Sequence, residues 1–294
     1  MRTDFPEITV HIDRQLGLGE GPCWSPEEQA LYFIDIQAPA LMRLDPATAA
    51  IRSWRMPATI GSFGFCPDGR AIVALRNGVH FFDFKTETLE FLVHPEPDKP
   101  TNRLNDGKIG PDGRFWVGSM DDRPDRQPVA ALYRIDADGS SHQMFDGLYV
   151  SNGLAFSPDG RTLWHSDSRG PWVHTFDLDR KTGALSNQRK VITLTDAEGR
   201  PDGGACDTEG YYWSAGVSAG CINRIAPGGT IERKIKVPLA APTMPCFGGP
   251  DLKTLYVTSL TSDRLGPKEA GSLISFRVDV PGAPIAKFGE PLKL

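Results

Sequence analysis

The sequence predicts an all-β fold, a six-bladed β-propeller with four-stranded blades whose ring is closed by an N-terminal strand. Three observations support this prediction. A turn of the Pro-Asp-Gly type recurs six times, a run of strand-forming residues follows each turn, and no stretch shows the apolar period of a helix. Successive turns begin 41 to 50 residues apart, which is the length of chain that one propeller blade occupies.

The recurring turn is a β-hairpin signal. Proline presets the backbone of the turn, Asp and Gly complete it, and the residues that follow favour a strand. We expect the strand before each turn to be the innermost of its blade and to line the central channel. The six turns begin at Pro26, Pro67, Pro111, Pro158, Thr208 and Pro250.

Each repeat contains a further strand with its own signature. Most of these runs alternate apolar and polar residues, the period of a half-buried strand. They are Leu41–Asp45, Val79–Asp83, Ala131–Asp136, Val173–Asp177, Cys221–Ile225 and Leu273–Arg277. The stretch Glu7–His11 precedes the first repeat, and we expect it to form the outer strand of the last blade, because closure removes exposed sheet edges. The repeats predict one propeller domain over residues 1–294.

Composition excludes several classes of protein. A formal net charge of −5 gives no reason to expect a nucleic acid as partner. No run of about 18 apolar residues exists, so no membrane partner is expected, and Met1–Val10 lacks the apolar stretch of a signal peptide. We therefore expect a cytoplasmic protein, with the oligomeric state left open. The five cysteines include no C-x-x-C pair and are expected to be reduced, buried thiols.

One position of the repeat is polar in most blades. The residue six places before each turn is Glu20, Gly61, Asn105, Asn152, Asp202 or Met244. Equivalent positions in a ring of blades point to equivalent places, so these oxygens should converge at one mouth of the channel. Buried oxygens of this kind need a partner, and a divalent cation satisfies them. Ca²⁺, Mg²⁺ and Mn²⁺ suit such a set best, and Zn²⁺ or Fe²⁺ can also bind it.

Short segments that contain these residues resemble the family of regucalcin (senescence marker protein) and the gluconolactonases. They occur in the family's order along nearly the whole chain. The segments are Leu18–Pro22, Asn102–Lys108, Ser151–Leu154 and Pro201–Gly203, with Cys246–Gly249 as a weaker fifth. The resemblance implies a six-bladed propeller that holds one divalent metal and hydrolyses aldonolactones.

The resemblance also implies roles for individual residues. The family's three metal ligands correspond to Glu20, Asn152 and Asp202, the same residues that the repeat brings together. Its Arg and Asn that bind substrate hydroxyls correspond to Arg103 and Asn105.

The family's acidic substrate contact has no unambiguous counterpart in this chain. A strict offset from Arg103 places it on Arg123, whereas Asp121 or Asp122 can take its place. We take Asp122 as the candidate. The surrounding segment, Asp121–Pro128, is charged and lacks strand character, so it predicts either a lid over the channel mouth or an ordinary surface loop.

These observations predict metal-dependent hydrolysis of a sugar lactone to the aldonic acid. Asp202 is the candidate general base, although the metal-activated water itself could carry more of the attack. Two alternatives stay open. One is a metal-dependent propeller esterase or organophosphatase, which would need a more apolar pocket. The other is a non-enzymatic calcium-binding regulatory propeller, which would bind the ion without turnover.

Overall fold

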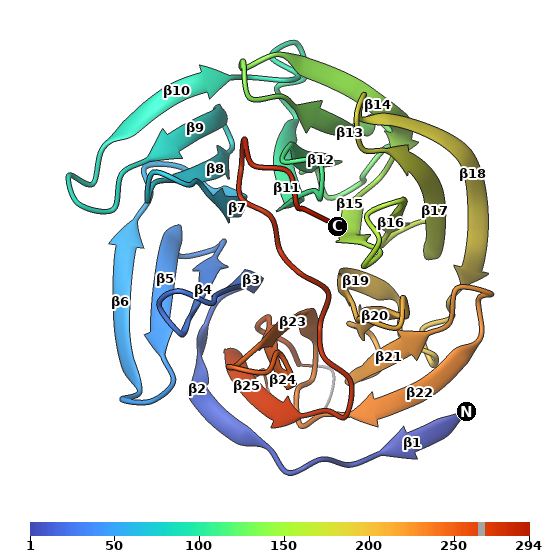
Figure 1. Ribbon diagram of the computed structural model, residues 1–294. Helices are drawn as coiled ribbons and strands as arrows, with labels where there is room; N and C mark the ends of the chain where they lie inside the picture. The colour runs from blue at the N-terminus through green and yellow to red at the C-terminus, as the bar shows by residue number, and fades with distance from the viewer. Residues whose placement is uncertain (264–267) are drawn as a thin grey trace.

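The computed structural model describes residues 1–263 and 268–294, and within these ranges six antiparallel sheets are arranged in a ring around a central axis (Figure 1). This confirms the predicted six-bladed propeller. The described residues form strands and turns, and none of them belongs to a helix that could cross a membrane. All five cysteines are free thiols, as predicted.

In each blade the strands follow chain order from the axis outward, except that the outer strand of the sixth blade comes from the N-terminus. The innermost strands are β3 (Gly19–Ser25), β7 (Ile60–Phe65), β11 (Asn102–Ile109), β15 (Ser151–Phe156), β19 (Pro201–Cys206) and β23 (Pro242–Gly248). The second strands are β4 (Ala30–Asp35), β8 (Ala71–Leu75), β12 (Phe115–Asp121), β16 (Thr162–Asp167), β20 (Tyr212–Gly216) and β24 (Thr254–Ser259). The third strands are β5 (Ala40–Asp45), β9 (Gly78–Phe82), β13 (Ala130–Ile135), β17 (Trp172–Asp179), β21 (Cys221–Ile225) and β25 (Gly271–Arg277). The outer strands are β6 (Ala50–Arg55), β10 (Leu89–Val93), β14 (Ser141–Leu148), β18 (Ala184–Thr193), β22 (Ile231–Lys236) and β2 (Thr9–Leu16).

The N-terminal segment closes the ring. Strand β2 pairs antiparallel with β25 and so completes the sixth blade, as predicted, although it spans Thr9–Leu16 rather than the expected Glu7–His11. An additional strand, β1 (Arg2–Asp4), pairs parallel with β22 on the outside of the fifth blade (Figure 1). The sequence did not predict β1, because three residues are too few to show a strand period.

The core lies between the blades. The buried apolar side chains form six clusters in the described residues, one between each pair of neighbouring blades. Alternate residues of one strand serve two clusters. In β4, Tyr32 and Ile34 pack toward the second blade, whereas Leu31 and Phe33 pack toward the sixth. Burial on both faces explains why second strands such as β4 and β8 are nearly continuous apolar runs, and it holds the blades in register around the axis.

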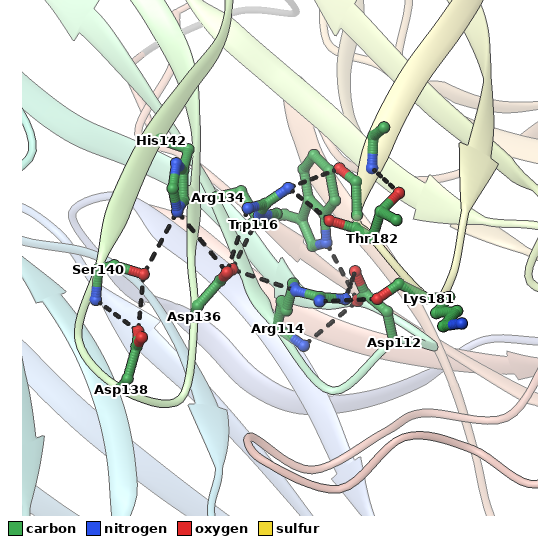
Figure 2. Close-up of polar contacts among 12 residues, drawn as sticks. Asp112, Arg114, Trp116, Arg134, Asp136, Asp138, Ser140, His142, Lys181 and Thr182 are labelled. Carbon is green, nitrogen blue, oxygen red and sulfur yellow. Dashed lines mark hydrogen bonds and ion pairs between the residues drawn. The ribbon is translucent and has the colours of Figure 1, made fainter.

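Polar contacts also join neighbouring blades. Figure 2 shows Arg134 of the third blade beside Thr182 in the β17–β18 turn of the fourth blade, where Nη1 donates to the carbonyl oxygen of Thr182 at 3.0 Å. The same Nη1 donates to the carbonyl oxygen of Gly183 at 2.9 Å. Asp136 holds this guanidinium from the other side, with 2.8 Å between Arg134 Nε and its Oδ1. Arg114 reaches the same turn through Lys181. The buried cation is therefore fully paired, as a stable interblade contact requires.

The C-terminal segment closes one end of the channel. It crosses the centre of the ring (Figure 1) and is tied to the ends of the inner strands, with Phe288 N donating to Phe65 O at 2.8 Å and Leu292 N donating to Pro111 O at 2.9 Å. A mostly apolar cavity of about 60 Å³ lies beneath it. The opposite end of the channel, where the inner strands begin, is the polar end.

Candidate active site

The polar end of the channel contains a pocket of about 180 Å³. The structure brings together there five of the residues that the sequence singled out. They are Glu20, Arg103, Asn105, Asn152 and Asp202. They come from four different inner strands, so the pocket depends on the closed ring and not on any single blade.

A β-bulge orients each of these side chains. The pairing of the inner strand with its neighbour shifts register close to the same repeat position in all six described sheets. A bulge redirects the adjacent side chain. Gly21 and Gly153, which directly follow Glu20 and Asn152, have φ angles of +52° and +64°. Glycine adopts this left-handed conformation without the steric cost that other residues pay. Gly21 and Gly153 therefore allow the backbone to adopt the bulged conformation at these positions.

The carboxylates of the pocket repel one another. Glu20 and Asp202 are both buried, with 8% of each residue exposed. Burial raises the pKa of Glu20 well above its usual range, and the negative charges of Asp202 and Asp106 raise it further. Burial likewise raises the pKa of Asp202, with Asp106 adding to the effect. Without a cation, each of these groups therefore keeps its proton to a higher pH in the folded protein than in the unfolded chain.

Asp106 is a residue that the sequence analysis missed. It is buried near Glu20 and Asp202, accepts a hydrogen bond at Oδ2 from Leu154 N at 2.9 Å, and burial raises its pKa. Its other carboxylate oxygen, Oδ1, is buried without a hydrogen-bond partner among the described residues. Asp106 directly follows Asn105 in the sequence, and this position could have indicated that it lies near the pocket. An unsatisfied anionic oxygen in such a place favours a nearby positive charge.

Asn152 links the two sides of the pocket. Its Nδ2 donates to Oδ1 of Asp202 and, at 3.0 Å, to Oγ of Ser168. Its Oδ1 accepts only a long contact of 3.3 Å from Gly153 N and so retains capacity for another partner.

The donor chemistry of this pocket fits a hard divalent cation. Glu20 and Asp202 supply two carboxylates and Asn152 supplies a carboxamide oxygen, all of the oxygen type that such ions prefer. In the described ranges no three His, Cys, Asp or Glu side chains form a metal-binding cluster, and the oxygen set of this pocket is completed by the carboxamide of Asn152.

Arg103 and Asn105 form one unit on the wall of the pocket. Nη1 of Arg103 donates to Oδ1 of Asn105 at 2.8 Å, and Nδ2 of Asn105 donates to the carbonyl oxygen of Ser151 at 2.9 Å. Asp122 lies beside the same arginine, with 3.4 Å between Nε and Oδ1, and also pairs with Arg76 at 2.5 Å. The side chains of Arg103 and Asn105 are thus held in place, and each keeps some free hydrogen-bonding capacity.

The structure separates the three candidates for the acidic contact. Asp121 is fully buried and organises its own loop, accepting hydrogen bonds from Arg123 Nη2 at 2.8 Å and Gln127 N at 2.7 Å. Arg123 is occupied by this pairing. Asp122 alone of the three lies against Arg103. The segment that follows Asp121 is a loop, as expected, and it contributes Arg126 to the lining of the pocket.

Three further arginines of the pocket escaped the sequence analysis. Arg126, Arg169 and Arg200 line it from three different connections between strands. Nothing in their local sequence shows that these loops meet. Only the position of Arg200, two residues before Asp202, offered a signal.

Comparisons with known proteins identify the same family from the sequence and from the structure, and the matches cover most of the chain. Residues 18–261 match the SMP-30/gluconolactonase/LRE-like region. The chain is 38% identical to the 6-deoxy-6-sulfogluconolactonase of Pseudomonas putida over 280 residues, 94% of each protein. It is 37% identical to the regucalcin of Xenopus laevis over 258 residues, 86% of each. The structure resembles that of a regucalcin from Agrobacterium tumefaciens, described as a calcium-binding protein, with a TM-score of 0.92, 26% identity and coverage of 99% of this chain and 100% of the other.

Proposed function

Because the chain belongs to the family of the SMP-30/gluconolactonase/LRE-like region, we propose that it is a hydrolase that opens a sugar lactone to the corresponding aldonic acid with the help of one divalent metal ion. One observation carries the proposal. A pair of buried carboxylates with raised pKa values shares a single pocket with an arginine and an asparagine suited to bind hydroxyl groups.

Glu20, Asn152 and Asp202 are the residues that would hold the metal. When bound, a divalent ion supplies Lewis acidity, which polarises the lactone carbonyl and lowers the pKa of the attacking water. The protein's own contribution is to hold the ligands at bulges of a rigid ring, so that the site does not have to reorganise during the reaction.

Asp202 is the proposed general base. As the water oxygen bonds to the carbonyl carbon, Asp202 accepts one proton from the water. The bond from that carbon to the ring oxygen then breaks, and the proton passes to the ring oxygen, which becomes the hydroxyl of the open acid. Burial and the charge of Asp106 raise the pKa of Asp202 in the metal-free protein, and a bound cation would lower it again.

Arg103, Asn105 and Asp122 are proposed to orient the ring. Arg103 supplies donors only, Asn105 supplies a donor and an acceptor, and Asp122 supplies acceptors. Sugar hydroxyls need both kinds of partner, which this set provides. A site built to bond hydroxyls discriminates strongly against substrates that lack them.

The experiment that tests the proposal measures lactone hydrolysis by metal-stripped protein. Ca²⁺, Mg²⁺, Mn²⁺, Zn²⁺ and Fe²⁺ are restored one at a time, with gluconolactone, xylonolactone, arabinolactone and galactonolactone as substrates. We expect negligible turnover of every lactone without metal and turnover of at least one with a preferred ion. Binding of metal without turnover of any lactone would contradict the lactonase and favour a calcium-binding regulator.

Replacement of Arg103 by alanine separates the lactonase from the organophosphatase alternative. A hydrogen bond from a charged donor contributes about 1.5–3 kcal/mol. We therefore expect kcat/KM for the sugar lactone to fall roughly tenfold to hundredfold. Arg103→Lys should recover only part of this loss, because an ammonium group cannot replace the planar fork. A phosphotriester or simple aryl ester that is hydrolysed at an unchanged rate by both variants, faster than any lactone, would support the alternative.

A further inference from the structure

The pocket carries more positive charge than a neutral lactone requires. Four arginines line it, Arg103, Arg126, Arg169 and Arg200, against the carboxylates of Glu20 and Asp202. A divalent metal would balance the two carboxylates, Asp122 accompanies Arg103, and Arg200 pairs with Asp196, with 3.7 Å between Nη1 and Oδ1. The guanidinium groups of Arg126 and Arg169 are then in excess around the pocket.

Three of the four arginines converge from separate parts of the ring. Arg126 lies on the loop between β12 and β13, Arg169 on the turn between β16 and β17, and Arg200 on the connection that leads into β19. None of these segments neighbours another in the sequence. Their meeting at one pocket is therefore a property of the fold.

The backbone at each arginine is fixed by hydrogen bonds. Asp121 holds the Arg126 loop by accepting from Gln127 N. Asp167 Oδ1 accepts from Arg169 N at 2.8 Å. Ser218 Oγ accepts from Arg200 N at 2.7 Å. Such preorganisation lowers the entropic cost of binding a ligand with these side chains.

Arg126 is the arginine most clearly directed at a ligand. It lines the pocket and lies close enough to Arg103 for its positive charge to add to the effect of burial, which lowers the pKa of Arg103. Its Nε atom is buried and has no hydrogen-bond partner in the described part of the chain. Arg103 and Arg126 are neighbouring cations, and Nε of Arg126 is a buried donor without a partner. A bound anion would stabilise both features.

We propose that the lactone substrate carries an oxyanion substituent, a sulfonate, carboxylate or phosphate, at the end of the sugar away from the ring carbonyl, and that Arg126 binds it together with Arg169. This inference rests on the proposed lactonase function. Guanidinium groups donate hydrogen bonds and cannot accept them, so two of them in one pocket match the oxygens of an anion better than they match hydroxyls.

The test compares lactones that differ only at carbon 6. Gluconolactone is the neutral member, and 6-deoxy-6-sulfogluconolactone, 6-phosphogluconolactone and glucarolactone carry the three anions. We expect kcat/KM to be at least tenfold higher for one of the anionic lactones than for the neutral one. In Arg126→Gln this ratio should fall about tenfold, and in Arg169→Gln it should fall as well. Arg126→Lys, which keeps the charge without the fork, should give an intermediate ratio.

Arg189→Gln is the matched control. It removes the same charge from outer strand β18, where Arg189 pairs with Asp177 at 2.6 Å and both side chains are about half exposed, at 49% and 45%. The ratio should stay at the wild-type value in this variant. A neutral lactone that is preferred, or a ratio that is unchanged in both Arg126→Gln and Arg169→Gln, would overturn the inference and leave the lactonase intact.

A binding measurement separates the two proposals if no lactone is hydrolysed. Calorimetry compares gluconate with 6-deoxy-6-sulfogluconate, 6-phosphogluconate and glucarate, which differ from gluconate only at carbon 6. Tighter binding of one of these anionic acids that is lost in Arg126→Gln would support the anion site even if the lactonase failed. Equal affinities for all four acids would overturn it.

Discussion

Replacement of Asp202 by asparagine is expected to lower kcat/KM for lactone hydrolysis by roughly 10³-fold. The substitution keeps the size of the side chain but removes a proposed metal ligand and the proposed base in one step. It also leaves the Nδ2 donor of Asn152 facing a carboxamide in place of a carboxylate. We further expect metal affinity, measured by calorimetry on the stripped protein, to fall strongly, because Glu20 would be the only remaining carboxylate that lines the pocket.

The outcome of this substitution separates the two roles of Asp202. Loss of both metal binding and turnover fits a residue that is ligand and base. Metal binding at wild-type affinity with loss of turnover would leave Asp202 as the base alone. Retention of both would refute the assignment. Asp159→Asn removes a carboxylate from the exposed turn between β15 and β16 and should leave both measurements unchanged.

The contribution of the three pocket carboxylates to the stability of the metal-free protein is expected to fall with rising pH, and divalent metal should reverse that loss. Glu20, Asp106 and Asp202 have pKa values in the folded state above the value of about 4 that they have when unfolded. Between these values the folded state binds more protons than the unfolded state. Their contribution to stability is therefore present below about pH 4 and is lost as the pH rises through the raised pKa values.

A buried histidine changes stability with pH in the opposite direction, so its contribution must be separated from that of the carboxylates. Burial lowers the pKa of His165 to about 3, so this residue adds stability as the pH rises from about 3 to about 6.5. The clean measurement is the difference in free energy of unfolding between metal-loaded and metal-free protein at each pH, because His165 contributes equally to both. We expect this difference to grow by up to about 1.4 kcal/mol per pH unit for each proton that the metal displaces.

The same measurement on Asp202→Asn provides the comparison. This variant lacks one of the mutually repelling carboxylates, so its metal-free form should be more stable than the wild type near pH 8. Because it binds metal weakly, its difference between metal-loaded and metal-free protein should be small and nearly flat with pH. A wild-type difference that does not change between pH 5 and pH 8 would show that metal binding displaces no protons from these groups.

Much of the fold was predictable because its signals are local and repeated. A turn that recurs every 41 to 50 residues, with strand runs on either side, specifies a blade without reference to the rest of the chain. The same repetition placed Glu20, Asn105, Asn152 and Asp202 at equivalent positions. Equivalent positions in a ring must face the same axis, so their convergence followed from the sequence, and the structure confirms it.

Tertiary structure alone decided the features that depend on how loops and strand ends meet. The sequence could not choose between Asp121 and Asp122, because adjacent residues differ only in the direction of their side chains. In the fold, Asp121 turns into its own loop and Asp122 turns toward Arg103. Strand β1 and the C-terminal closure of the channel are likewise long-range pairings of short segments without a period of their own.

Some of the charged groups of the pocket could be predicted from the sequence, and others could not. The sequence determined its carboxylates and amides, since these belong to the repeated inner strand. Arg126, Arg169 and Arg200 lie on connections of differing length that share no pattern, and the closed ring brings them to one mouth. The chemistry near the axis is therefore readable from the repeat, whereas the recognition of the outer part of a ligand depends on loop geometry that only the folded ring provides.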